Sequence, residues 1–109
     1  MENDKEPKSI LDRLNRRFYS EDVKSFTFKH QYKPGLVSYF TIDIGKKYKI
    51  NSNTKKINGF IVEVLAFIYN QGQNPINSTP IGVRVKFLRN NNTGSYYDLY
   101  ELNEVLEES

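Results

Sequence analysis

Apolar and polar residues alternate most clearly over residues 83–87, where three apolar side chains are separated by Arg84 and Lys86. A period of two is typical of a β-strand that buries one face and exposes the other to solvent. Residues 60–68 are apolar in both rows except at Glu63, which predicts a strand covered on both faces and central to its sheet. We expect the rest of the chain to be arranged around these two strands.

The segment 23–44 carries a second two-residue pattern, interrupted by Pro34 and Gly35. Proline presets the backbone at the second position of a type II turn, and glycine accepts the positive φ of the third position. Alternating runs on both sides of such a turn predict a β-hairpin over residues 23–44. Further strands are expected over residues 46–50 and 95–100.

Near the N-terminus the spacing of apolar residues changes to three and four, and Ser9 begins a capping-box pattern. Both features predict an amphipathic helix over residues 9–19. Arg13, Arg16 and Arg17 lie beside the apolar stripe of this helix. They form either a solvated flank or an edge that faces an anion.

Residues 69–80 are almost entirely polar and predict a long exposed loop, a kind of segment that is often functional. An acidic run closes the chain, with four glutamates between residues 101 and 108. If the chain binds another protein, we expect the contacts to come from these two segments. The predicted protein-binding residues are Tyr69, Gln73, Asn74, Ile76, Glu101 and Glu104.

A length of 109 residues favours one domain, and seven Phe with eight Tyr supply enough large side chains for a core. The absence of cysteine excludes disulfides, a thiolate nucleophile and cysteine-based zinc sites. The charged first residues lack the apolar region of a secretory signal. The longest apolar run, residues 60–69, is about half the length that spans a bilayer. We therefore expect a cytoplasmic protein of a bacterial host cell, with no membrane partner.

The net charge of +3 is distributed unevenly. Residues 1–58 contain 13 Lys or Arg and 7 Asp or Glu, whereas residues 59–109 contain 3 and 6. This asymmetry indicates either a polyanionic or acidic partner for the basic half, or a solvated basic surface. The abundance of Asn, Lys, Ile and Tyr, which have A/T-rich codons, favours a low-GC bacterium or one of its phages or mobile elements as the source.

Residues suited to catalysis are scarce. His30 falls on the apolar face of the predicted hairpin, where a hydrogen-bonded structural histidine is more common than a catalyst. Glu63 lies in the central strand, where a structural ion pair is the more common role. The sequence has no phosphate-binding glycine loop, no His-x-x-x-His metal spacing and no nucleophile elbow. We therefore predict a non-enzymatic protein with no catalytic residues, no metal, no cofactor and no small-molecule substrate.

The order of the predicted strands carries a family resemblance. A lysine-rich first strand, Gly59 before the central strand, the alternation over 83–87 and the aromatic run over 97–102 resemble small SH3-like barrels of the KOW and phage-protein type. The resemblance covers residues 45–106 and departs from that pattern in the length of the loop over 69–80.

Together with the helix and hairpin predicted above, which lie outside the resemblance, it gives a mainly β (α+β) fold, with an N-terminal helix and a β-hairpin packed on a five-stranded SH3-like barrel. Residues 1–44 would form the helix and hairpin extension and residues 45–109 the barrel, within one compact unit. The expected core residues are Ile50, Val62, Val64, Ala66, Val83, Val85, Phe87, Leu99 and Leu102.

Basic residues interleaved with aromatic residues are the strongest functional signal, because phosphates bind cations and bases stack on aromatic rings. They predict contact with nucleic acid or with a nucleoprotein. The alternative is that the tyrosines belong to the core. The predicted nucleic-acid-binding residues are Arg13, Arg16, Arg17, Lys46, Lys47, Tyr48, Lys49, Lys55 and Lys56.

In general character the chain is similar to the anti-CRISPR proteins of phages and mobile elements, which are small proteins that act by binding to the surface of a host protein. This resemblance implies a CRISPR effector with its guide RNA as a partner. The alternative is a phage or plasmid accessory protein that binds another protein without contacting nucleic acid.

Overall fold

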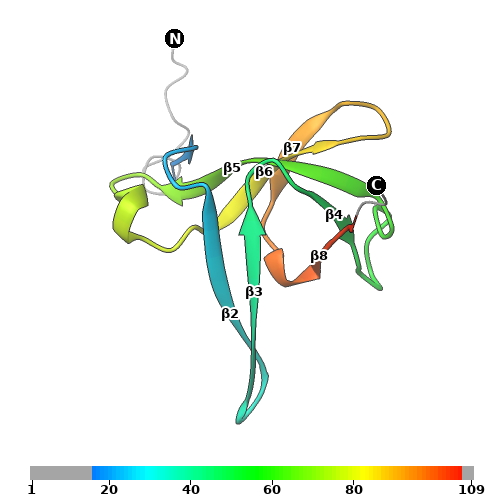
Figure 1. Cartoon of the computed structure of the whole chain (residues 1–109), viewed down its shortest axis with the longest axis horizontal. Helices are drawn as coiled ribbons and strands as arrows, with labels where there is room; N and C mark the ends of the chain where they lie inside the picture. Colours follow the sequence, from blue (N-terminus) through cyan, green and yellow to red (C-terminus); the bar gives the residue numbers. More distant parts are fainter. Residues whose placement is uncertain (1–15, 107–109) are drawn as a thin grey trace.

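The computed structural model describes residues 16–106. They form a six-stranded antiparallel sheet and a separate two-stranded hairpin (Figure 1). The strands are β1 (Arg17–Ser20), β2 (Ser25–Lys33), β3 (Leu36–Asp43), β4 (Lys47–Ile50), β5 (Ile61–Asn70), β6 (Gly82–Phe87), β7 (Thr93–Tyr96) and β8 (Leu102–Glu104). Two short 3-10 helices, η1 (Pro75–Asn77) and η2 (Leu99–Glu101), lie in the connections.

Strand β5 is the centre of the large sheet, as the apolar pattern predicted. β6 pairs along one edge of β5, whereas β4 and β1 share its other edge. A bulge at Leu65 bends β5, since Val64 lies opposite Val85 and Ala66 opposite Arg84. The bulge lies between the part of β5 that pairs with β4 and the part that pairs with β1.

The inner face of the sheet and the base of the hairpin form the core. Val64, Phe67, Val83 and Val85 are fully buried on this face. Phe28 of β2 packs over them, with its ring centroid 6.4 Å from that of Phe67. Seven of the expected core residues are buried in this cluster: Ile50, Val62, Val64, Val83, Val85, Leu99 and Leu102. The two others differ, because Phe87 is only partly buried and Ala66 is buried outside the cluster.

The prediction of a five-stranded SH3-like barrel is wrong. The sheet is open, with β7 and β8 as its outer strands, and it has a sixth strand, β1, from outside residues 45–106. A closed barrel needs its edge strands to pair with each other. Here residues 67–70 of the long, bulged β5 pair with β1, and β7 and β8 stay unpaired with each other.

The predicted helix over residues 9–19 is also wrong where the structure describes it, and no described helix is longer than three residues. Arg17–Ser20 is a strand, and it pairs with β5 from Asn70 to Phe67. Phe18, which completed the helical stripe in the sequence, stacks on Tyr69 at 5.7 Å between centroids. Residues 9–15 lie outside the described residues.

The hairpin predicted over residues 23–44 is present as β2 and β3, joined by the turn at Pro34 and Gly35. Gly35 has a φ of 80°, which glycine adopts without strain. The hairpin is longer than its packed base, so its tip projects away from the sheet (Figure 1). Within residues 16–106, no helix is long and apolar enough to cross a bilayer.

Candidate nucleic-acid interface

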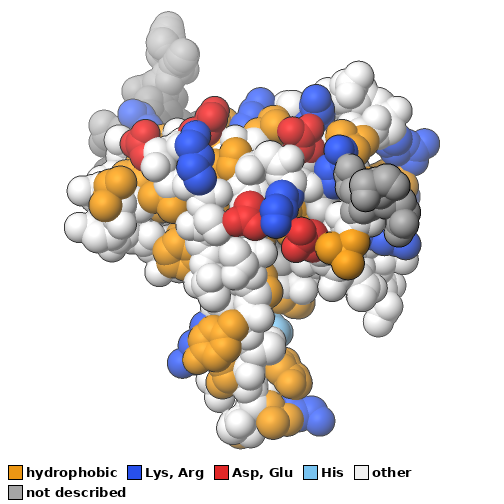
Figure 2. All heavy atoms as spheres, viewed as in Figure 1, with side chains coloured by type: hydrophobic (Ala, Val, Ile, Leu, Met, Phe, Trp, Pro, Cys, Tyr) orange, Lys and Arg blue, Asp and Glu red, His pale blue; other side chains and the backbone are white. Residues whose placement is uncertain are grey.

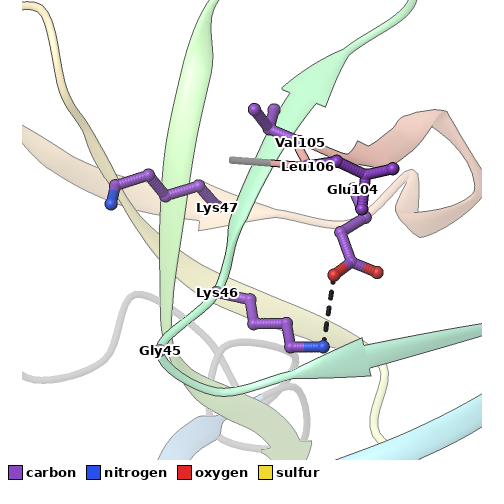
Figure 3. Close-up of a pocket in the computed structure, with 6 residues that line it drawn as sticks. All are labelled: Gly45, Lys46, Lys47, Glu104, Val105 and Leu106. Atoms are coloured by element: carbon purple, nitrogen blue, oxygen red, sulfur yellow. Dashed lines mark ion pairs between the residues drawn. The ribbon is translucent and has the colours of Figure 1, made fainter. Parts of the chain in front are cut away.

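Two of the predicted basic residues, Lys46 and Lys55, are paired with carboxylates. The Lys46 ammonium lies 3.3 Å from Asp43 Oδ2 and 3.2 Å from Glu104 Oε2. Hydrogen bonds to Glu104 and Asp43 raise the pKa of Lys46. Figure 3 shows Lys46 pointing toward Glu104 across a shallow pocket, while Lys47 points away from it.

Lys55 is also paired with two carboxylates, which come from the segment around η2. Its ammonium lies 2.6 Å from Asp98 Oδ2 and 2.7 Å from Glu101 Oε1, and both hydrogen bonds raise its pKa. The Tyr96 hydroxyl donates to the same Glu101 oxygen. Burial, together with this bond, raises the pKa of Tyr96 to about 12. Burial opposes ionisation of Glu101, but hydrogen bonds from Lys55 and Tyr96 still lower its pKa.

Oppositely charged segments of the chain lie side by side in the sheet. The pairing of β4 with β8 brings the basic segment 46–49 beside the acidic segment 101–104. Glu101 and Glu104, predicted to bind a protein, are therefore internal partners of Lys55 and Lys46.

Other predicted site residues are structural as well. Tyr48 is buried, and its hydroxyl accepts a hydrogen bond from the Asp43 backbone at 2.8 Å. Tyr69 is buried, and its hydroxyl has no partner among the described residues. Gln73 Oε1 accepts from the Asn70 backbone at 2.7 Å, and Asn74 caps η1. The remaining predicted residues are exposed at Arg16, Arg17, Lys49, Lys56 and Ile76, half-buried at Lys47, and outside the described residues at Arg13.

The outer face of the six-stranded sheet, opposite the hairpin base, carries three of the predicted cations together with two that were not predicted. Strand alternation places five Lys or Arg side chains on this face: Arg17 from β1, Lys47 and Lys49 from β4, and Arg84 and Lys86 from β6. Glu63 is the one carboxylate that the six described strands place there, and it lies 3.9 Å from the Lys86 ammonium. The described strands therefore place five cations and one carboxylate on this face.

Two tyrosines on the outer face are covered by arginines. The Arg84 guanidinium lies 4.6 Å from the centre of the Tyr19 ring, and that of Arg17 lies 5.2 Å from the Tyr97 ring. Arg84 also donates to Thr93 Oγ1 at 3.0 Å, which fixes its plane. Both tyrosines stay accessible, with 50% of Tyr19 and 44% of Tyr97 exposed. The sheet thus presents cation and aromatic planes side by side.

The local backbone holds these rings in place. A Cβ at Gly82 would lie 2.6 Å from Cδ1 of Tyr97 and 2.8 Å from the Tyr96 carbonyl oxygen. Only glycine therefore lets the Tyr97 ring lie directly on β6. A hydrogen bond from Ser95 and the nearby Arg84 charge lower the pKa of Tyr19.

The described residues offer little for catalysis or metal binding. Within residues 16–106 no group of three or more His, Asp or Glu side chains could hold a metal ion. His30 stacks on Tyr100 at 4.4 Å between centroids, and Glu63 lies beside Lys86.

Sequence reasoning missed three residues of the outer face: Tyr19, Arg84 and Lys86. A signal for two of them was present, because the alternation over residues 83–87 already put Arg84 and Lys86 on the solvated side of their strand. Tyr19 was hidden by its assignment to a helix. Comparison with protein-family models, curated proteins and solved structures gives no match for this chain.

Proposed function

We propose that this chain is a non-enzymatic nucleic-acid-binding module whose outer sheet face binds a single strand. The observation that carries the proposal is the excess of Lys and Arg over the single carboxylate that the described strands place on this face, combined with the Arg84–Tyr19 and Arg17–Tyr97 stacks. A single strand exposes both its phosphates and its base faces, so it suits a surface that offers cations and flat rings together.

The two kinds of side chain have separate roles. Lys and Arg side chains bind phosphates and release counterions, which makes the affinity fall as salt is raised. Tyrosine rings and guanidinium planes stack on bases, at about 1–3 kcal/mol per base, with little dependence on sequence. We therefore expect a binder that prefers single strands but discriminates weakly between sequences.

The outer face is a better candidate than Lys46 and Lys55 of the predicted set. Lys46 and Lys55 each contact two carboxylates, which a phosphate would have to displace. The exposed Arg17 and Lys49 have no acidic partner among the described residues.

The test is the affinity for a fluorescent single-stranded oligonucleotide, measured by anisotropy over a salt series. Arg17→Ala with Arg84→Ala should weaken binding about tenfold or more, because it removes two phosphate contacts and two stacking planes. Lys24→Ala with Lys46→Ala is the matched control, since it removes the same charge from lysines paired with Glu21 and with Asp43 and Glu104. The control should weaken binding less than about twofold, in line with the small effect of paired surface charges.

Absence of binding by the unaltered protein at about 50 mM salt would refute the proposal. An equal loss in both double variants would also refute the assigned face, because only net charge would then matter.

A CRISPR effector with its guide RNA stays a proposed partner of the same face, since guide RNA is a nucleic acid whose exposed segments are single-stranded. Purified protein would be mixed with effector, guide and target DNA. Undiminished cleavage at a several-fold molar excess, across several type II effectors, would remove this partner and leave the single-strand activity standing.

A further inference from the structure

The projecting part of the hairpin is the second unusual surface of the molecule. We call residues 29–39 the arm. Four large apolar or aromatic side chains on it are exposed, at 56% for Tyr32, 46% for Leu36, 37% for Val37 and 68% for Tyr39. Soluble proteins seldom expose such a group together unless it contacts a partner.

The charge of the arm indicates the kind of partner. Residues 26–42 contain no Asp or Glu, and Figure 2 shows hydrophobic, basic and histidine side chains on the arm without an acidic one on the face in view. Lys29 and Lys33 are exposed and have no acidic partner among the described residues. In contrast, Lys46 and Lys55 on the body are each held by two carboxylates. The arm therefore complements an anionic surface.

The arm is held in position. At its base Phe28 stacks on Phe40 at 5.4 Å and reaches Phe67 of the core. Further out, His30 lies parallel to the exposed Tyr100 ring, at 4.4 Å between centroids and 4° between planes. Such anchoring reduces the entropy lost on binding.

We propose that the arm binds double-stranded DNA in its major groove. That groove is about 12 Å wide and admits a two-stranded β-ribbon. Lys29 and Lys33 bind phosphates, and Leu36 at the tip contacts base edges, where thymine methyl groups accept apolar side chains. A protein partner is less favoured, because the cores of protein interfaces are depleted of lysine.

This inference rests on the proposed nucleic-acid binding and deepens it with a second ligand form. The hairpin packs on the inner face of the sheet, so the arm and the outer face are separate surfaces. One molecule would then hold a duplex on the arm and a single strand on the sheet.

The test compares duplex and single-stranded oligonucleotides of equal length in the same anisotropy assay. Lys29→Glu with Lys33→Glu should weaken duplex binding about tenfold or more and lower the salt slope by roughly two, since each phosphate contact contributes about 0.9. Single-strand affinity should fall less than about threefold, because the outer face is unchanged. Lys24→Glu with Lys56→Glu is the matched control, with the same change in charge away from the arm.

A second measurement locates the contact. Because the chain has no cysteine, Leu36→Cys allows a single environment-sensitive fluorophore at the tip. Its emission should shift on addition of duplex, whereas the same label at Ile76→Cys, on the exposed loop, should not respond.

The outcomes separate the two proposals. If the unaltered protein binds neither oligonucleotide, both proposals fail. If it binds single strands but the arm variant keeps its duplex affinity, or the tip label stays silent, only the arm proposal fails and a protein partner takes its place. If the arm variant lost affinity equally for both oligonucleotides, or if the control variant lost as much duplex affinity as the arm variant, the duplex assignment would be overturned.

Discussion

The inner and outer faces of the six-stranded sheet come from alternate residues of the same strands, yet they differ in almost every physical property. On β6, Val83 and Val85 are fully buried, while Arg84 and Lys86, which alternate with them, carry charge on the outside. The inner face is covered by the hairpin base, and the outer face is covered only partly by its own long side chains. The comparison teaches that stability depends on one face, which leaves the other free to vary with function.

The largest effect should come from the inner face. Val85→Asp places an unpaired carboxylate among fully buried side chains. We expect a loss of about 4 kcal/mol or more in the free energy of unfolding, comparable with the whole stability of a small domain. Urea titration followed by circular dichroism measures this loss.

Lys49→Asp is the control for the opposite face, because it introduces the same side chain at an exposed position of β4. Its free energy of unfolding should change by no more than about 0.5–1 kcal/mol. Equal losses at the two positions would contradict the assignment of the faces.

The strands that carry this contrast could be predicted from the sequence, because a two-residue period is a property of neighbouring side chains. The patterns over residues 60–68 and 83–87 gave β5 and β6, and the Pro34-Gly35 turn gave the hairpin. Strand pairing is not local, so the sequence did not show that β1 would take the free edge of β5. Four residues of β1 are also too few to separate a strand from the end of a helical stripe.

The candidate site was predictable to a smaller extent. Arg84 and Lys86 were placed on the solvated side of their strand, but nothing local indicates that Tyr19 would reach Arg84 across β5. The net charge of a segment also does not reveal ion pairs. The carboxylates that bind Lys55, Asp98 and Glu101, lie 43 and 46 residues further along the sequence.

Tyr96 and Tyr97 are neighbours on opposite faces and offer a test of intermediate size. At neutral pH, Tyr96→Phe should lower the free energy of unfolding by about 1–2 kcal/mol, since Glu101 loses a hydrogen bond. Tyr97→Phe removes a hydroxyl from the exposed face and serves as the matched control. Chemical denaturation at several pH values measures both.

The same variant has a defined pH dependence. Unfolded tyrosine ionises near 10.0, whereas the folded pKa of Tyr96 is about 12. Its contribution to stability is therefore complete below pH 10 and is lost as pH rises through 12, by on the order of 2 kcal/mol. The deficit of Tyr96→Phe should shrink over this range. If the stability deficit of Tyr96→Phe stayed constant over this range, ionisation of Tyr96 would not be the source of the stability lost at high pH.

Arg84→Lys should have a smaller effect, confined to binding. Lysine keeps the charge but loses the flat guanidinium over Tyr19. We expect single-strand affinity to fall about three- to tenfold from the lost stacking plane, with little change in melting temperature. Unchanged affinity would mean that the outer face binds by charge alone.

The smallest effect should be at Lys46, which lies three positions from Lys49 but not on the outer face. Lys46 is already held by Asp43 and Glu104, whereas Lys49 is exposed and has no acidic partner among the described residues. Lys49→Ala should weaken single-strand binding about threefold at moderate salt, the share of one phosphate contact. Lys46→Ala removes the same charge and should change binding by less than about 1.5-fold, because a paired cation releases no counterions. Anisotropy on the two variants decides the matter: a larger loss at Lys46 than at Lys49 would move the binding surface to the β4–β8 edge and reverse the contrast between the faces.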